Sequence, residues 1–127
     1  YKDSLEKWQA VETLCAELSV HTKPKDIGGG VLIVPMLSWY EPGFDEDPDI
    51  EHESLPPVEQ AMMDFMLCKW PHGLSASSDS LAHYMDGLNG DVPETDGLTA
   101  VISFSHFLPR KELMPEKRYL YYPPLVK

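Results

Sequence analysis

The first hydrophobic pattern along the chain has helical spacing. Apolar residues fall on one side of a helix drawn over residues 4–19, and the charged residues lie mostly off that side. The apolar stripe consists of Leu5, Trp8, Val11, Cys15 and Leu18. Ser4 is a suitable N-cap, and Pro24 with the glycines that follow it prevents the helix from continuing. The pattern therefore predicts one amphipathic helix at the start of the chain.

Two later segments are rich in β-branched residues and predict strands. The run 31–34 is continuously apolar, and 99–105 is similar in composition. Neither run shows the alternation of a strand with one solvent-facing side. Continuous apolar character is typical of strands that are buried on both faces of an α/β sheet. The sequence therefore predicts two buried strands, flanked by helices.

Two further helical patterns lie between the predicted strands. The first begins at Pro57 and the second at Ser78 or Asp79, with Gly90 closing it. Their apolar positions are Val58, Met62, Phe65 and Met66 in the first, and Leu81, Tyr84, Met85 and Leu88 in the second. The order helix, strand, helix, helix, strand predicts an α/β fold with long proline-rich loops. Two strands make a poor sheet, so we expect their neighbours to lie outside these 127 residues.

Composition and charge exclude several functional classes. The 127 residues carry a net charge of −11, which argues against a protein that binds nucleic acid or an anionic membrane surface. No apolar run is long enough for a transmembrane helix. The two cysteines, Cys15 and Cys68, form no disulfide framework, and we expect buried structural thiols in a reduced intracellular compartment. An apolar content of 43% is sufficient for a folded core.

An acidic loop is the most conspicuous charged feature. Six carboxylates lie between Asp45 and Glu53, and Asp45-x-Asp47-x-Asp49 matches the first ligands of an EF-hand. Ile50 then stands where that loop needs glycine, and Pro56 where it needs a bidentate glutamate, which excludes an EF-hand. A solvated loop is the simplest interpretation, and an adventitious cation or a docking surface for a basic protein partner are the alternatives. The glycines at 28–30 precede a strand, unlike a phosphate-binding loop, and indicate a turn.

Among the five histidines, His106 has the most suggestive position. It directly follows the predicted strand 99–105, and ligands and metals gather beyond the carboxyl ends of strands in open α/β sheets. A neutral imidazole is a common metal ligand. We therefore expect the ring of His106 to point into a cleft at this edge of the sheet. The other histidines lie in predicted loops or on a helix and match no motif: His21, His52, His72 and His83.

The segment around His106 resembles the strand and Ser-His motif of the calcineurin-like metallophosphoesterases. It reads Val101-Ile-Ser-Phe-Ser-His-Phe-Leu-Pro-Arg110, with the family's proline displaced by one residue. Residues 33–40, 68–71 and 115–120 resemble a branch of that family from photosynthetic eukaryotes. The sequence does not identify the organelle, and both cytosol and plastid are compatible with it. The resemblance implies part of a metallophosphoesterase α/β sandwich, in which His106 binds one of two divalent cations (Mn, Fe or Zn).

The chain contains only the fourth of the family's five motifs. No Asp-x-His, Asn-His or His-x-His occurs, and Gly90-Asp91 follows a predicted helix rather than a buried strand. Residues 1–127 are therefore expected to be an interior part of one phosphoesterase domain that hydrolyses phosphate esters by two-metal activation of water. Arg110 could approach the phosphate, although a solvated basic tail explains it more simply. The alternative is a noncatalytic structural or interaction subunit of a larger assembly.

Overall fold

The computed structural model describes residues 1–44, 56–91 and 93–113, and the predicted acidic loop lies outside them. The architecture is α/β, with helices and a small mixed sheet. The elements are α1 (Ser4–Glu17), β1 (Lys25–Asp26), β2 (Val31–Pro35), α2 (Val58–Ala61), α3 (Met63–Leu67), α4 (Asp79–Asn89), β3 (Ala100–Phe104) and the 3-10 turn η1 (Lys111–Leu113). Within this part of the chain no helix is long and apolar enough to cross a membrane.

The sheet has the order β1-β2-β3. The two-residue β1 pairs antiparallel with β2, so one neighbour of β2 lies within the chain and not outside it as expected. Strand β2 pairs in parallel with β3, with Val31 opposite Ala100 and Pro35 opposite Phe104. The glycine turn predicted at 28–30 joins β1 to β2, and all three of its glycines have positive φ. A Cβ on Gly30 would come within 2.8 Å of Thr99 Oγ1, so only glycine fits beside the start of β3.

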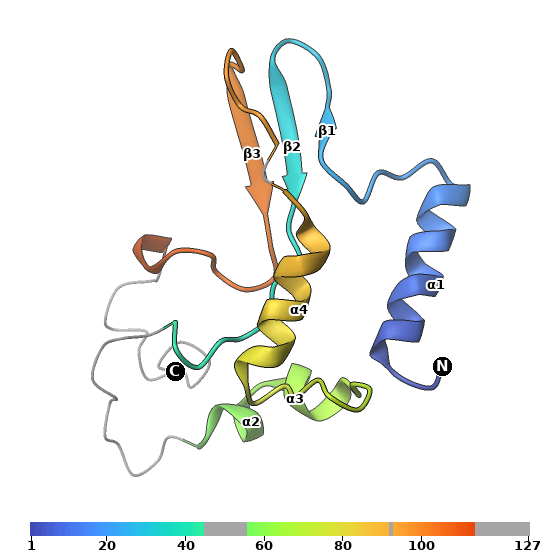
Figure 1. The fold of residues 1–127 in the computed structure, drawn as a ribbon, viewed down its shortest axis with the longest axis vertical. Helices are drawn as coiled ribbons and strands as arrows, with labels where there is room; N and C mark the ends of the chain where they lie inside the picture. Colours follow the sequence, from blue (N-terminus) through green and yellow to red (C-terminus); the bar gives the residue numbers. More distant parts are fainter. Residues whose placement is uncertain (45–55, 92, 114–127) are drawn as a thin grey trace.

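The prediction that both strands are buried was wrong for β3. All five of its residues are exposed, with exposed fractions of 46% for Val101, 52% for Ile102 and 59% for Phe104. In β2, Leu32 is buried and the other residues are half-buried. Figure 1 shows the reason: the sheet projects away from the helices, which lie mainly beyond the carboxyl ends of β2 and β3. Neither face of β3 is therefore covered in the described part of the chain.

The exposed edge of β3 leads to a prediction about the 127-residue chain. An edge strand with unpaired backbone groups and large apolar side chains promotes association. Because the net charge of −11 opposes contact between copies, association should increase as salt screens that repulsion. We expect Ile102→Lys to raise the monomer fraction in size-exclusion chromatography without changing near-UV circular dichroism. A wild-type chain that stays monodisperse and monomeric with rigid aromatic signals at high salt would contradict this prediction.

The hydrophobic core lies beyond the carboxyl ends of the parallel strands β2 and β3. Trp39, Leu81 and Ala82 are its buried residues, so the segment after β2 packs directly on α4. The partly buried residues around them are Tyr40, Cys68, Trp70, Leu74, Ala76, Met85 and Phe107. This arrangement places the core, and with it the residues that follow β3, at the edge where the sequence predicted a functional site.

The helices agree with the sequence patterns to different degrees. Helix α4 begins and ends as predicted: the Ser78 hydroxyl accepts from the Ser80 N–H, and Gly90 caps the other end with a φ of 71°. At α1 the N-cap is Asp3 rather than Ser4. The helix predicted from Pro57 is broken at Met62, whose backbone is extended, and neither α2 nor α3 has a side-chain cap. Both pieces are short, as expected where no cap stabilises a helix start.

Candidate functional site

His106 lies two residues beyond the end of β3, as the sequence predicted for a ligand at the carboxyl edge of the sheet. The parallel pairing extends past β2, because the Met36 N–H donates to the Phe104 carbonyl at 2.9 Å. A second hydrogen bond joins the segment that follows β2 to the segment that follows β3. The Phe107 N–H donates to the Ser38 hydroxyl at 3.0 Å. His106 is therefore held between two fixed points of the backbone.

The neighbouring Phe107 anchors this segment in the core. Its ring lies 5.6 Å from the Trp39 ring, and the His106 ring stands edge-on to Phe107 at 4.8 Å, measured between ring centroids. Trp39 itself contacts the rings of Phe65 and Trp70 and donates its indole N–H to the Ala76 carbonyl at 3.1 Å. Aromatic packing of this kind fixes the direction in which His106 leaves the core.

The structure brings an aspartate to His106 that the sequence analysis missed. The His106 Nε2 atom is 3.0 Å from Asp64 Oδ1, which comes from the first turn of α3. The His106 side chain is 65% exposed and that of Asp64 is 31% exposed. Asp64 lies off the apolar stripe of its helix and in no motif, and 42 residues separate the two side chains. No local signal in the sequence could have paired them.

The chemistry of this contact indicates which ring nitrogen of His106 donates. An ionised carboxylate can only accept hydrogen bonds, so His106 Nε2 must donate to Asp64. In the neutral imidazole, the lone pair is then on Nδ1, and no other hydrogen bond to the ring occurs among the described residues. Histidines that bind metals commonly donate their second ring N–H to a carboxylate, which orients the ring and fixes the tautomer. The pair has the pattern of a metal-ligating histidine and its positioning residue.

The described residues include ligand types that bind metals, but too few of them lie together to hold a cation. A catalytic cation needs about three protein ligands, and the described ranges contain no group of three His, Cys, Asp or Glu side chains that could hold one. The pair by itself therefore does not form a complete metal centre. The sequence analysis predicted that the ring of His106 points into a cleft. The side chain is instead 65% exposed to solvent.

The remaining candidates are distributed elsewhere. Two contacts of 3.2 Å join the Arg110 guanidinium to the Glu112 carboxylate, and this hydrogen bonding holds the pKa of Glu112 below its usual value. Arg110 is thus exposed and paired with Glu112. Gly90-Asp91 lies at the end of α4, consistent with its rejection as a family motif. Cys15 and Cys68 are free thiols, but they are half-buried rather than buried as predicted.

Comparison of the chain with protein-family models, with curated proteins and with solved structures finds no match.

Proposed function

We propose that residues 1–127 are the interior part of a calcineurin-like phosphoesterase domain and that His106 binds one of its two divalent cations. The observation that carries the proposal is the hydrogen bond between His106 and Asp64 at the carboxyl edge of a parallel strand pair. The position of His106 and its hydrogen bonding both favour a metal ligand. Parallel strands direct their carboxyl ends to the same edge, where ligands bind in open α/β sheets. The carboxylate leaves His106 Nδ1 available for a cation.

Four residues at this edge of the sheet have specific parts in the proposal. His106 donates a nitrogen ligand, and Asp64 is a positioning residue that holds the ring and its tautomer. Ser38 and Phe107 hold the backbone beside it through the 3.0 Å hydrogen bond described above. The other ligands would come from the family's remaining motifs in flanking sequence. Two bound cations would supply Lewis-acid activation of the phosphate and of a water molecule. The substrate is proposed only as a phosphate ester.

The test is hydrolysis of an aryl phosphate by the chain expressed together with its flanking sequence. We expect turnover that requires Mn²⁺, Fe²⁺ or Zn²⁺ and disappears on chelation. Asp64→Ala should lower turnover by about 10- to 100-fold, the usual effect of losing the group that orients a histidine ligand. Asp64→Asn keeps a hydrogen-bond acceptor and should lose less. The matched control is Asp86→Ala, because Asp86 is an exposed carboxylate on α4.

The absence of turnover with every metal would contradict the enzymatic proposal. It would favour the noncatalytic alternative, in which the chain is a structural or interaction subunit and the acidic loop at 45–53 is its docking surface. In that case Asp64→Ala should change neither metal content nor any hydrolytic rate. Binding of a protein partner should then fall on neutralising those carboxylates.

A further inference from the structure

A groove of about 560 Å³ lies between α1, residues 67–70 and α4. Its volume is within the range of pockets that bind small molecules. The apolar side chains of its wall come from all three segments: Leu5, Trp8, Val11, Trp70, Met85 and Leu88. Neither His106 nor Asp64 lines it. The groove is therefore separate from the proposed metal site, and the following argument is independent of phosphoesterase activity.

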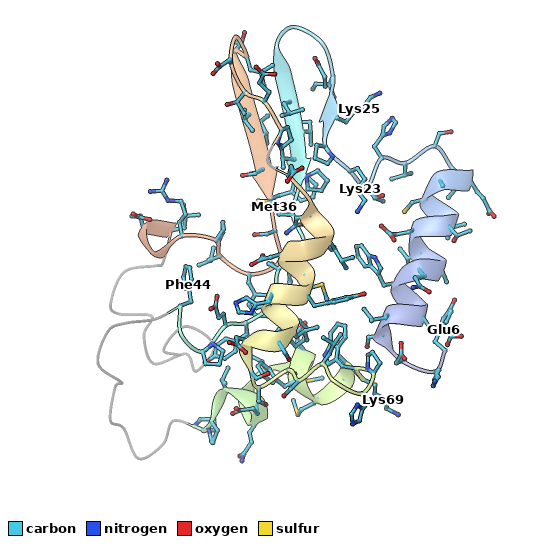
Figure 2. All side chains as sticks on the ribbon, in the orientation of Figure 1. Glu6, Lys23, Lys25, Met36, Phe44 and Lys69 are labelled. Carbon is cyan, nitrogen blue, oxygen red and sulfur yellow. The ribbon has the colours of Figure 1, made fainter. Side chains whose placement is uncertain are left out.

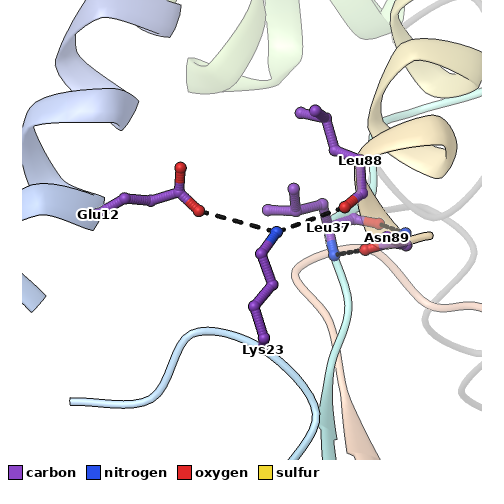
Figure 3. Close-up of polar contacts among 5 residues, drawn as sticks. All are labelled: Glu12, Lys23, Leu37, Leu88 and Asn89. Carbon is purple, nitrogen blue, oxygen red and sulfur yellow. Dashed lines mark hydrogen bonds and ion pairs between the residues drawn. The ribbon is translucent and has the colours of Figure 1, made fainter. Parts of the chain in front are cut away.

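Polar contacts at two points hold α1 beside this groove. At the start of α1, the Ser4 N–H donates to the Lys69 carbonyl at 2.7 Å, and the Lys69 N–H donates to the Ser4 hydroxyl at 2.9 Å. Near the other end, Lys23 Nζ lies 3.9 Å from Glu12 Oε1 and donates to the Leu88 carbonyl at 3.4 Å (Figure 3). These contacts fix the position of the helix relative to α4.

The apolar side of α1 is only partly covered: Leu5, Trp8 and Cys15 are half-buried. No residue of α1 is buried, although the helix is 14 residues long. Helices of this length in proteins gain most of their stability by packing an apolar face against something. Here the face that carries Trp8 and Val11 opens onto the groove rather than onto another element. An apolar molecule bound in the groove would pack against this face of α1.

The charge of the groove is opposite to that of the chain. Lys2, Lys7 and Lys69 line it, and Lys69 lies close to the start of α1 (Figure 2). Asp3 is the one acidic residue among the lining residues, and its carboxylate already accepts from the Glu6 N–H at 2.9 Å. Three lysines and one aspartate thus line an apolar groove in a chain whose net charge is −11. Such a local excess of positive charge attracts an anionic group.

The groove also borders an unsatisfied hydrogen-bond donor. The indole N–H of Trp70 is buried and has no partner among the described residues. Buried indole N–H groups usually find an acceptor, and leaving one unpaired is unfavourable. Trp70 is a wall residue of the groove and directly follows Lys69 in the chain.

We propose that this groove binds an amphipathic organic anion, a long-chain carboxylate. The carboxylate group lies among the lysines, and the hydrocarbon chain lies along Trp8, Trp70 and Met85. The lysines act as point charges, which suits a single carboxylate. The apolar wall provides the larger part of the contact, as in most ligand pockets.

The test uses 12-bromododecanoate, because its bromine quenches tryptophan fluorescence at contact and two of the three tryptophans line the groove. Titration of the 127-residue chain should give saturable quenching at one equivalent. Lys69→Gln should weaken binding at least about tenfold through loss of a charge partner. Lys25→Gln removes the same charge from β1, outside the groove, and should leave binding unchanged (Figure 2).

A second variant keeps the test decisive if the lysines compensate for one another. Val11→Trp fills the groove from an exposed helix position, so folding should persist while binding is lost. Wild-type affinity in both Lys69→Gln and Val11→Trp would overturn the proposal. So would equal binding of 12-bromododecanol, or quenching that never saturates. A chain that binds only after dissociation of a dimer would also overturn it, because a second copy would then be the occupant of the groove.

Discussion

Replacing His106 with alanine is expected to lower phosphoester turnover at least about 100-fold in the chain with its flanking sequence. The variant removes a proposed metal ligand, and its effect should exceed that of losing the carboxylate that orients it. Stability should change little, because the His106 side chain is 65% exposed and its one ion pair is on the surface. The loss should therefore appear in turnover while circular dichroism is retained.

His83→Ala is the matched control for this substitution. His83 is exposed on α4, and no ion pair or hydrogen bond involves its side chain in the described part of the chain. Its replacement should leave turnover within about twofold of the wild type. Equal losses in the two variants would mean that histidine substitution acts through folding rather than through a metal. That result would remove the support for His106 as a ligand.

The largest effect on stability is expected for Leu81→Ala. Leu81 has an exposed fraction of 0% and is the only side chain that the described residues bury completely. It packs with Trp39 and Ala82 in the core. Truncation of a fully buried leucine removes apolar contact and leaves a cavity, which costs about 2–5 kcal/mol. Since this core is small, we expect about 3 kcal/mol and a large loss of near-UV aromatic signal.

Urea unfolding followed by tryptophan fluorescence measures this difference. Leu14→Ala provides the control, because Leu14 is exposed on α1 and alanine is favourable in a helix. It should change the free energy of unfolding by less than about 0.5 kcal/mol. If Leu81→Ala were no more destabilising than Leu14→Ala, the core assigned around Trp39 would be wrong.

The elements that the sequence predicted best are those with local signals. Helix α4 combines a serine N-cap, a regular apolar stripe and a terminal glycine, and each acts within a few residues. The β-branched runs located β2 and β3 for a similar reason. Burial of β3 could not be predicted in this way, because it depends on which elements cover the sheet. The apolar run of 99–105 is compatible both with a buried strand and with the exposed edge that the structure has.

The candidate site was predictable in position but not in partners. A histidine directly after a strand is a local pattern, and His106 lies where that pattern places it. Its contact with Asp64 depends on the break at Met62 and on the packing of Phe65 against Trp39. Both are long-range features, so the apolar periodicity of the predicted helix could not predict them. The resemblance to the phosphoesterases depends on the residues around His106 and stays a prediction.

Metal content is the most direct test of the proposed site. The chain with its flanking sequence should be loaded with Mn²⁺ or Zn²⁺, dialysed against metal-free buffer, and measured by elemental analysis. We predict two retained cations per wild-type chain and per His83→Ala chain, and the loss of at least one in His106→Ala, since removal of a ligand weakens retention. Equal metal content in His106→Ala and wild type, or no retained metal in the wild type, would contradict the assignment of His106 as a metal ligand.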